Sequence, residues 1–435
     1  MRLSFINIGC KVNFAEISEI ADEFVREGAD IVEFGKESDV VLINTCTVTH
    51  HADADCRKII RRAARTSPEA SIIVTGCYAQ INPDEIAAID GVAAVVGMND
   101  KFHIRKIIDD LKHNGAPAIY MSIHINDEFH GACSADNDTH TRVFFKIQDG
   151  CDYSCSYCTI PLARGGNRSM SIDEISRRLK QIEVGGYREI ILSGINLGDY
   201  HYTPDKRFID VLRHIENTGT NMRVRISSIE PNLLTNEILE LVSNSRIICP
   251  HFHIPLQSGS PQILGLMRRR YKASYFEELI NKIKHKIPDC CIGVDVIAGF
   301  PGETDELFAQ TYNLLESLPV SYLHAFTYSE RANTDAASFS TQVSPTSKKE
   351  RTLRLRLLSE EKKMVFYKSQ IDTERFVIPE VISQETGFGS GWTENYVRVR
   401  FPINELQINY DKEASEPVKV KLLEISGSEV LAKIC

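Results

Sequence analysis

The amino-acid sequence predicts an α/β protein with an N-terminal parallel α/β domain, a partial (βα)6 barrel of the TIM type and a small antiparallel β-barrel at the C-terminus. The first two parts are predicted because short β-branched runs alternate with helical periodicity in two separate series. The third part is predicted because strand-like alternation replaces the helical pattern near the C-terminus. A chain of 435 residues is long enough for about three domains.

The first series occupies residues 1–112 and is expected to form one domain. Right-handed crossovers between successive strands give a parallel sheet. Residues 113–140 are polar and lack a strong period, so we expect a linker there. The expected strands are Leu3–Ile8, Val40–Asn44, Ser71–Thr75 and Ala93–Gly97, and the expected helices are Glu16–Glu27 and Asp53–Ala64.

The second series occupies residues 141–335. Its six βα-type repeats predict a partial barrel whose site lies at the C-terminal ends of the strands. The expected strands are Arg142–Ile147, Glu189–Leu192, Met222–Ile226, His251–Pro255, Cys291–Ala298 and Tyr322–Thr327, and the expected helices are Ser171–Val184, Arg207–Glu216, Asn236–Val242, Ala273–His285 and Thr304–Ser317.

The remainder of the chain divides in two. Residues 336–370 are expected to form a basic helical connector, and residues 371–435 a small β domain. Glycine-containing turns at Gly387–Gly391 and Ser426–Gly427 separate the strands of that domain. The expected strands are Phe376–Ser383, Asn395–Phe401, Val418–Ile425 and Val430–Ile434.

Composition restricts the class of protein. No window approaches about 18 uninterrupted apolar residues, and the apolar stretch near Met1 is too short for a signal peptide, so we expect a cytoplasmic protein without a membrane segment. The net charge of −9 by itself argues against a nucleic-acid partner. The chain has 12 cysteines, and in a reducing cytosol clustered cysteines are first interpreted as metal or redox ligands.

Three cysteines follow the first expected strand of the second series. Cys151, Cys155 and Cys158 stand within eight residues, and three thiolates can hold three corners of a [4Fe–4S] cluster. The fourth iron then has no protein ligand and can bind a small molecule. The alternative is a zinc site that borrows a distant histidine such as His140, although zinc loops more often pair two C-x2-C units.

The C-x3-C-x2-C spacing, with Tyr157 before the last cysteine, resembles the radical S-adenosylmethionine (SAM) superfamily. The resemblance implies that the open iron binds SAM and cleaves it to a radical. Small and polar residues at the other strand ends are expected to cradle this cofactor, although each taken singly is as readily a turn or helix cap. With Tyr157, the expected SAM-binding residues are Ser193, Gly194, Asn196, Ser228, Glu230, Gln257 and Gly299.

A second set of cysteines is scattered in the sequence. Cys10, Cys46 and Cys77 are 36 and 31 residues apart, close to one βαβ repeat, and each lies near the end of an expected parallel strand. Adjacent strands therefore bring the three thiols to one edge of the sheet. The alternative is that they are buried cysteines acting as small hydrophobes. The functional interpretation is a second, auxiliary cluster with an open iron.

The surroundings of these cysteines narrow the resemblance. Gly9-Cys10-Lys11-Val12-Asn13, Asn44-Thr45-Cys46-Thr47-Val48-Thr49 and Thr75-Gly76-Cys77 resemble the N-terminal domain of the methylthiotransferases, a family with a radical SAM core and a C-terminal TRAM domain. The resemblance implies two [4Fe–4S] clusters, SAM in two roles, a reductant protein such as flavodoxin or ferredoxin, and a monomer. The family inserts sulfur into a C–H bond as a methylthio group.

The same stretches look most like the bacterial branch that modifies N6-threonylcarbamoyladenosine next to the anticodon of tRNA, apart from His50-His51 after Thr49. Other branches act on isopentenyladenosine of tRNA or on a ribosomal-protein aspartate, and these stay open as alternatives. A non-enzymatic metal-cluster protein that binds RNA is the alternative of a different class.

Charge patterning supports an RNA partner despite the net charge. Residues 348–368 carry a net charge of +5, and two further basic runs stand near Arg57 and Arg268, whereas the β tail is net −4. Solvated helix faces are the usual explanation of each run taken singly, but three in an acidic protein favour a phosphate-binding surface. In the tail, Trp392 and Tyr396 either stack on bases or pack in the core. The candidate RNA-binding residues are Arg57, Arg61, Arg65, Arg268, Arg269, Arg354, Arg398 and Arg400.

Overall fold

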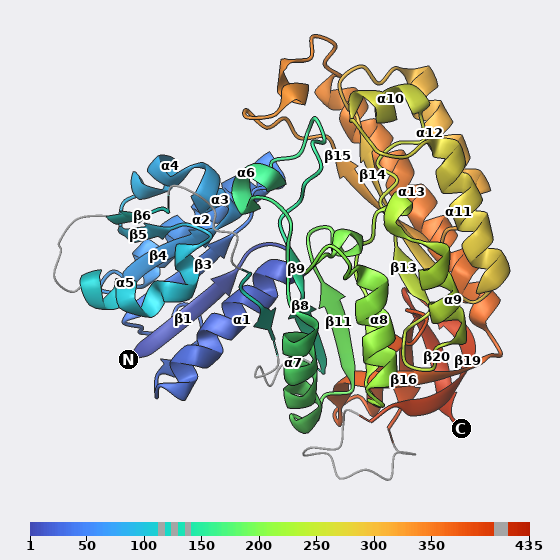
Figure 1. Cartoon of the computed structure of the whole chain (residues 1–435), viewed down its shortest axis with the longest axis horizontal. Coiled ribbons are helices and arrows are strands. Elements are labelled where there is room, and N and C mark those ends of the chain that lie inside the picture. The colour runs from blue at the N-terminus through green and yellow to red at the C-terminus, as the bar shows by residue number, and fades with distance from the viewer. Residues whose placement is uncertain (112–117, 123–128, 135–140, 404–415) are drawn as a thin grey trace.

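The structure is a computed structural model that describes residues 1–111, 118–122, 129–134, 141–403 and 416–435. It has three parts. In Figure 1 an N-terminal α/β domain (blue to cyan) lies beside a partial barrel (green to orange), and a C-terminal β-barrel (red) lies at the lower end of the partial barrel. Among the described residues, no helix combines the length and the apolar character needed to cross a membrane.

The N-terminal domain contains a parallel six-stranded sheet of order β2-β1-β3-β4-β5-β6, which confirms the predicted fold class. Two apolar clusters, one on each side of the sheet, form its core. The strands are β1 (Arg2–Asn7), β2 (Asp30–Ile31), β3 (Val40–Thr45), β4 (Ser71–Gly76), β5 (Val92–Val96) and β6 (Ala118–Tyr120), and the helices are α1 (Lys11–Arg26), α2 (His50–Thr66), α3 (Cys77–Ile81), α4 (Pro83–Ala87), the 3-10 helix η1 (Asp100–His103) and α5 (Ile104–Leu111).

The partial barrel contains six parallel strands in chain order. Strands β8, β11 and β12 form one sheet and β13, β14 and β15 another, and single parallel bridges (Val224 to Ile248 and Ser228 to His253) join the two. These strands are β8 (Arg142–Lys146), β11 (Glu189–Ser193), β12 (Arg223–Ile226), β13 (His251–His253), β14 (Cys291–Ala298) and β15 (Tyr322–Thr327). The main outer helices are α7 (Ile172–Val184), α8 (Phe208–Asn217), α9 (Asn236–Asn244), α11 (Ala273–Lys286) and α12 (Asp305–Ser317).

Shorter elements complete the barrel. They are β7 (Ala132–Cys133), β9 (Gln148–Asp149), α6 (Ile160–Arg164), β10 (Arg168–Ser169), η2 (Leu197–Asp199), η3 (Pro231–Leu233), α10 (Pro261–Leu266) and η4 (Asp335–Ser338).

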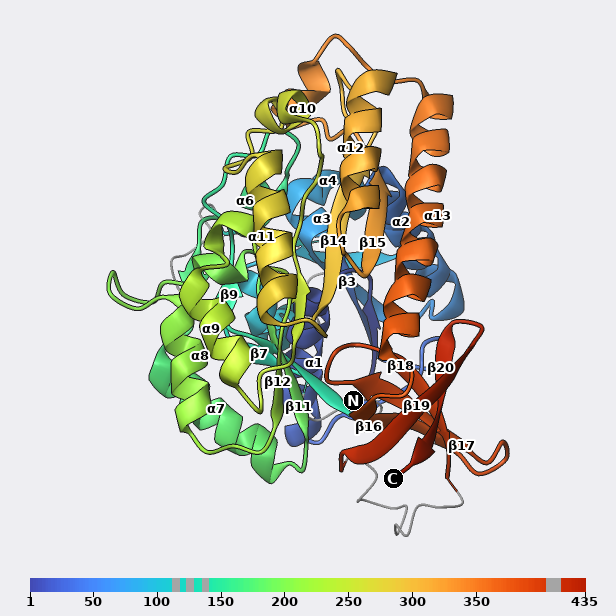
Figure 2. The same cartoon turned by 90° about the vertical axis from the view of Figure 1, so that its right-hand side faces the viewer.

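The C-terminal domain is a closed five-stranded barrel of order β16-β17-β18-β20-β19. Its pairs are antiparallel except β18 with β20, which is parallel. The long helix α13 (Pro345–Gln370) packs along β15 and ends at this barrel, as Figure 2 shows. The strands are β16 (Glu374–Ser383), β17 (Phe388–Thr393), β18 (Arg398–Pro402), β19 (Val418–Ser426) and β20 (Glu429–Ile434).

Two departures from the expected elements have physical causes. The segment expected as a linker contributes strands to both neighbouring sheets, since β6 pairs with β5 and β7 pairs antiparallel with β8. Residues 387–391 were expected to be a turn, but most of them belong to β17. Gly391 is needed there because a Cβ atom would stand only 2.0 Å from the Ile378 carbonyl oxygen.

The C-terminal barrel docks on the end of the partial barrel where its strands begin. The Arg223 guanidinium donates to the carbonyls of Phe376 and Trp392, and Glu189 accepts from Arg225 at 3.2 Å. The Tyr396 ring stacks between Trp392 and another ring, His251, with centroids 4.3 Å apart in both cases. Tyr396 and Trp392 therefore serve in packing between domains.

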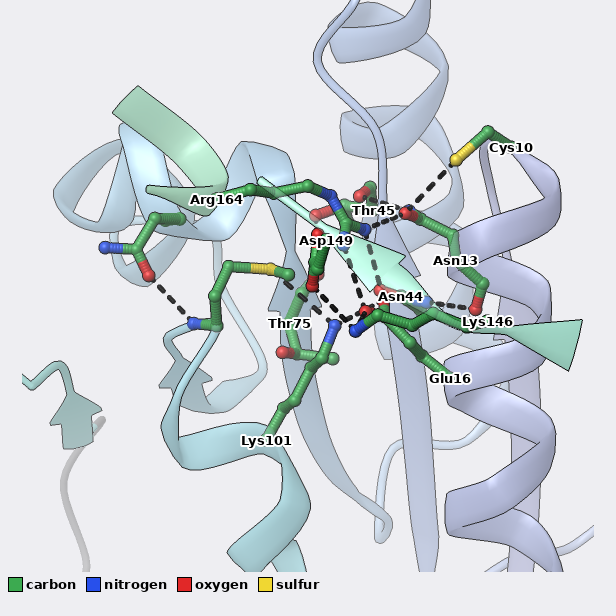
Figure 3. A network of polar contacts seen from close by, with 12 residues as sticks. Cys10, Asn13, Glu16, Asn44, Thr45, Thr75, Lys101, Lys146, Asp149 and Arg164 are labelled. Carbon is green, nitrogen blue, oxygen red and sulfur yellow. Dashed lines mark hydrogen bonds and ion pairs between the residues drawn. The ribbon is translucent and has the colours of Figure 1, made fainter. Parts of the chain in front are cut away.

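A buried ion network joins the N-terminal domain to the partial barrel (Figure 3). The Glu16 carboxylate on α1 lies 2.5 Å from the Lys101 ammonium, 2.7 Å from that of Lys146 and 3.0 Å from the Arg164 guanidinium. Asp149 lies 2.6 Å from Lys146 and 2.9 Å from Arg164. All five side chains are buried. Burial alone raises the pKa of Glu16, but the three cations outweigh it and hold that pKa well below its usual value.

This network generates a prediction about stability. We expect Glu16→Gln to lower the free energy of unfolding by about 3–5 kcal/mol at neutral pH, because Lys101 then has no carboxylate partner among the described residues and Lys146 and Arg164 share Asp149. Because the folded pKa is depressed, the contribution of Glu16 is present above the unfolded pKa of about 4.3 and is lost as the pH falls through the folded value. Thermal melting as a function of pH measures both effects.

The matched control is Glu27→Gln, which removes an exposed partner of Arg105 and should change stability by less than about 1 kcal/mol. Equal melting temperatures for the two variants would show that the network does not stabilise the domain interface.

Candidate active site between the two domains

The loop of Cys151, Cys155 and Cys158 lies between β9 and α6 at the C-terminal end of the partial barrel. The Arg269 guanidinium donates to the Cys155 sulfur at 3.2 Å, and the backbone amide of Tyr153 donates to the Cys151 sulfur at 3.4 Å. Burial raises the pKa of the Cys158 thiol to about 12, and the two neighbouring cysteines add to the rise. The three thiols thus share one site and line a cavity of about 430 Å³.

Several expected SAM-binding residues lie close to this loop. The Asn196 amide nitrogen stands 3.9 Å from the Cys151 sulfur, while its buried carbonyl oxygen has no partner among the described residues. Glu230 pairs with Arg269, which also stands 3.5 Å from the Tyr157 hydroxyl. Burial raises the pKa of Glu230. A polar atom left open beside the thiols fits a site that receives a polar cofactor.

The other expected cofactor residues lie at strand ends but differ in what they face. Gly194 packs on Gln148, Ser193 donates to the Ile191 carbonyl, and Ser228 forms the bridge to β13. Gln257, at a positive φ of 63°, lines the cavity between the domains that is described below. Gly299 is covered by α13, since a Cβ atom there would meet the Lys348 side chain at 2.3 Å. The absence of a side chain at Gly299 therefore lets α13 approach this strand end closely.

The scattered cysteines Cys10, Cys46 and Cys77 also meet at one edge. Cys10 caps α1 and is exposed, Cys46 follows β3, and Cys77 begins α3 directly after β4. Burial raises the pKa of Cys46 to about 12, and the Cys77 and Cys10 sulfurs add to the rise. Gly76 at φ 98° is required between β4 and Cys77, because a Cβ atom would stand 2.4 Å from the Thr45 carbonyl oxygen.

The ion network continues into this second site. The side-chain oxygen Oδ1 of Asn13 accepts a hydrogen bond from the Arg164 guanidinium at 2.5 Å, and the same oxygen lies 3.6 Å from the Cys10 sulfur (Figure 3). Burial raises the pKa of Cys77, and the charge of Arg164 opposes that rise. A cation of the partial barrel therefore favours a thiolate in the N-terminal domain.

A single-ion site of the zinc type needs three thiols close together. A zinc ion with thiolates at about 2.3 Å holds them about 3.8 Å apart. Among the described residues, one group of three possible metal ligands has its ligand atoms within 4.8 Å of one another, and it consists of His253, Asp295 and His324. This group contains no cysteine. Neither cysteine set forms a group of that spacing among the described residues. His140, the suggested zinc ligand, lies outside the described residues.

A cavity of about 250 Å³ lies between the two cysteine sets. Val48 and Thr49, just after Cys46, form one wall, and Tyr157 and Cys158 form another. The floor and far wall come from the barrel strands and the segment after β15: Gln257, Asp295, Ile297, Phe326, Thr327, Tyr328, Ser329 and Arg331. A molecule held here touches the loop that follows Cys46 and the loop that carries Cys158.

Arg331 was not anticipated from the sequence. Its guanidinium donates to Asp53 at 2.6 Å and to the Thr47 hydroxyl, so it fixes the loop after Cys46 to the end of β15. The backbone amide of His50 adds a 2.9 Å bond to the Ser329 hydroxyl. These contacts join residues nearly 280 positions apart, and no local pattern in the sequence indicates them. What distinguishes Arg331 is that it is buried, at 6% exposure, and this can be seen only in the structure.

The candidate RNA-binding arginines divide by exposure. The assignment of Arg269 to an RNA-binding surface is corrected, because its side chain is 4% exposed and belongs to the first cysteine site. Arg398 is largely neutralised by Glu380 and Glu429. The others lie at the surface or beside acidic or aromatic partners: Arg57 pairs with Glu85, Arg268 with Asp335, Arg354 lies over Phe308 and Tyr312, Arg400 lies over Phe388, and Arg61 and Arg65 are exposed on α2.

Comparisons with known proteins agree with this geometry. Residues 145–315 match the radical SAM superfamily, and residues 2–97 match an uncharacterized protein family, UPF0004. A solved structure of the radical S-adenosylmethionine methyltransferase TsrM from Kitasatospora setae, with cobalamin and a [4Fe-4S] cluster bound, shares the fold with a TM-score of 0.57 at 13% identity, covering 77% of each chain.

Sequence relatives extend over nearly the whole chain. It is 39% identical to the threonylcarbamoyladenosine tRNA methylthiotransferase MtaB of Bacillus subtilis, covering 97% of this chain and 93% of the relative. It is 34% identical to MtaB of Aquifex aeolicus, covering 92% and 96%. Since both cysteine-bearing domains and the C-terminal part fall within these matches, the chain belongs to the radical SAM methylthiotransferase family and is an enzyme of the MtaB type.

Proposed function

We propose that this enzyme places a methylthio group on N6-threonylcarbamoyladenosine next to the anticodon of tRNA, with one [4Fe–4S] cluster on each cysteine set. The observation that carries the proposal is the cavity between the domains, which is lined by residues that adjoin Cys46 on one side and by Cys158 on the other. A reaction that needs both a radical and a sulfur donor requires such a shared cavity.

The cofactors and the protein divide the work. When bound, a cluster with SAM supplies a radical that takes hydrogen from carbon, and the auxiliary cluster supplies the sulfur. Arg269 donates to the Cys155 sulfur, and the side-chain carbonyl oxygen of Asn196, which has no partner among the described residues, lies beside Cys151. Arg164 favours the thiolate of Cys77. The side chains of Ile297 and Phe326 line the cavity with apolar surface and limit water.

The choice of nucleoside follows the relatives, which are named for threonylcarbamoyladenosine. We also propose a TRAM-type role for the C-terminal barrel, flavodoxin or ferredoxin as the class of reductant, a monomeric state and a cytoplasmic location. Isopentenyladenosine, a ribosomal-protein aspartate and a non-catalytic RNA-binding role are separate outcomes of the tests below.

Iron content tests the two clusters. We expect about eight irons per anaerobically reconstituted chain, because each set holds one four-iron cluster. Replacing Cys151, Cys155 and Cys158 with alanine should leave about four irons and abolish SAM cleavage under dithionite.

The control replaces three cysteines outside both sets, Cys249, Cys290 and Cys435, and should retain about eight irons. One zinc and no iron in the wild-type chain would refute the clusters, and iron without SAM cleavage would favour the non-catalytic RNA-binding protein.

Nucleoside analysis tests the substrate. Deleting the gene should remove 2-methylthio-N6-threonylcarbamoyladenosine from total tRNA and leave the unmethylthiolated nucleoside to accumulate, as measured by mass spectrometry. Complementation with the wild-type chain restores it, and the variant lacking Cys10, Cys46 and Cys77 should not. Loss of methylthiolated isopentenyladenosine or of a modified ribosomal-protein aspartate instead would reassign the substrate.

Salt-dependent binding tests the RNA surface. Arg61 and Arg65 are exposed on α2, which begins four residues after Cys46. Changing both to glutamate should weaken tRNA binding and lower the salt-dependence slope by about 0.7–0.9 for each phosphate that the variant no longer neutralises. The same change at Arg213 on α8 and Arg246 after α9 is the control. Equal slopes for the two double variants would place the RNA elsewhere.

A further inference from the structure

The interior of the partial barrel carries a cluster of polar side chains that neither cysteine set uses. His253 on β13, Asp295 on β14 and His324 on β15 come from three adjacent strands. Asp295 pairs directly with His324, and His253 pairs with Gly293, two residues before Asp295. Residues two apart share a face, so the three side chains converge on one side of the sheet.

The geometry of this cluster suits a metal ion. The Asp295 carboxylate oxygen lies 2.8 Å from His253 Nε2 and 3.4 Å from His324 Nδ1, and all three ligand atoms lie within 4.8 Å of one another. Ligand atoms about 2.1 Å from a tetrahedral or octahedral ion are about 3.0–3.4 Å apart. Two imidazoles and one carboxylate form a ligand set that divalent first-row metals prefer.

The surroundings of His253 strengthen this interpretation. Its other ring nitrogen, Nδ1, lies 3.3 Å from the Tyr322 hydroxyl, which is also 3.1 Å from His251. A second hydrogen bond of this kind is typical of histidines that bind metals, because it fixes the ring and the nitrogen that faces the ion. Gly293 makes room for the Tyr322 ring, since a Cβ atom would stand 2.2 Å from it.

The cluster opens toward the cavity between the cysteine sets. Asp295 lines that cavity, whereas the side chains of His253 and His324 are 12% and 54% exposed. Three protein ligands leave at least one coordination position open, as in catalytic zinc sites. A carboxylate is a ligand that such a position accepts.

We propose that His253, Asp295 and His324 bind a divalent first-row metal ion whose open position holds the carboxylate of the target nucleoside. The first part stands on the three side chains alone. The second part rests on the proposed function, because the threonyl group carries a carboxylate, an anionic metal ligand that adenosine and isopentenyladenosine lack.

Manganese binding tests the metal site. Mn²⁺ prefers oxygen and imidazole ligands to thiolates, so it leaves the cysteine sets alone. The anaerobically reconstituted full chain is titrated with MnCl₂, and free Mn²⁺ is followed by its EPR signal. We expect one ion per chain, binding weakened at least tenfold in Asp295→Asn and His324→Ala, and about tenfold in Tyr322→Phe.

The matched control is His285→Ala, which removes an exposed histidine on α11 and should bind Mn²⁺ as the wild type does. Absence of binding by the wild type, or equal binding by the Asp295 and His324 variants, would overturn the site and leave a hydrogen-bonded network. His324→Ala keeps the test valid if Asp295→Asn fails to fold, because His324 is the most exposed of the three.

Adding nucleosides to the Mn²⁺-loaded chain tests whether the open coordination position of the metal holds the carboxylate. N6-threonylcarbamoyladenosine should change the EPR spectrum of bound Mn²⁺, and adenosine should not. If neither nucleoside changes it while Mn²⁺ still binds, the carboxylate assignment is wrong and the metal site remains. Failure of the proposed function is seen separately, in the nucleosides of the deletion strain.

Discussion

The arrangement of the molecule depends on the buried ion network around Glu16. One carboxylate of the N-terminal domain receives Lys101 from its own domain and Lys146 and Arg164 from the partial barrel. Charges buried this deeply are stable only when every partner is in place, so the network tolerates few relative positions of the two domains. Asn13 and Arg164 extend it to the auxiliary cysteines. The same contacts therefore set both the orientation of the domains and the surroundings of Cys10 and Cys77.

A second contact between the N-terminal domain and the partial barrel adjoins the cavity. Arg331 and Asp53 connect the end of β15 to the loop that follows Cys46. With the domains fixed at two separated places, the cavity between the cysteine sets has walls from both. The proposed reaction, in which two cofactors act on one substrate atom, requires this kind of preorganised spacing, because small displacements of reacting groups reduce rates steeply.

Much of the fold was predictable because its signals are local. Strands such as β14 and helices such as α12 follow from β-branched runs, helical spacing and caps, and the predicted ends agree with the structure within a few residues. The strands β6, β7 and β17 were missed, since their extended conformation depends on pairing with the neighbouring strands β5, β8 and β18 rather than on their own composition.

The site was predictable to the same extent and for the same reason. The cysteines are recognisable by spacing alone. Arg269 was misassigned because a run of three arginines looks like a surface, whereas the fold turns this one inward to Cys155. Arg164 and Arg331 were missed because their partners are about 150 and 280 residues away. Asp295 did carry a signal, an acidic residue within the apolar run of β14, but only the neighbouring strands give it meaning.

The helix α13 has a consequence for substrate size. Its 26 residues span about 39 Å at 1.5 Å per residue. Lys348 near its start covers Gly299 beside the catalytic end of the barrel, and Tyr367 near its other end packs in the core of the C-terminal barrel. The helix thereby fixes the distance between this end of the partial barrel and the C-terminal barrel. Lys348 and Tyr367 are 19 residues apart, about 28 Å along the helix, and a nucleic acid that contacts both ends must extend about that far, which a free nucleoside does not.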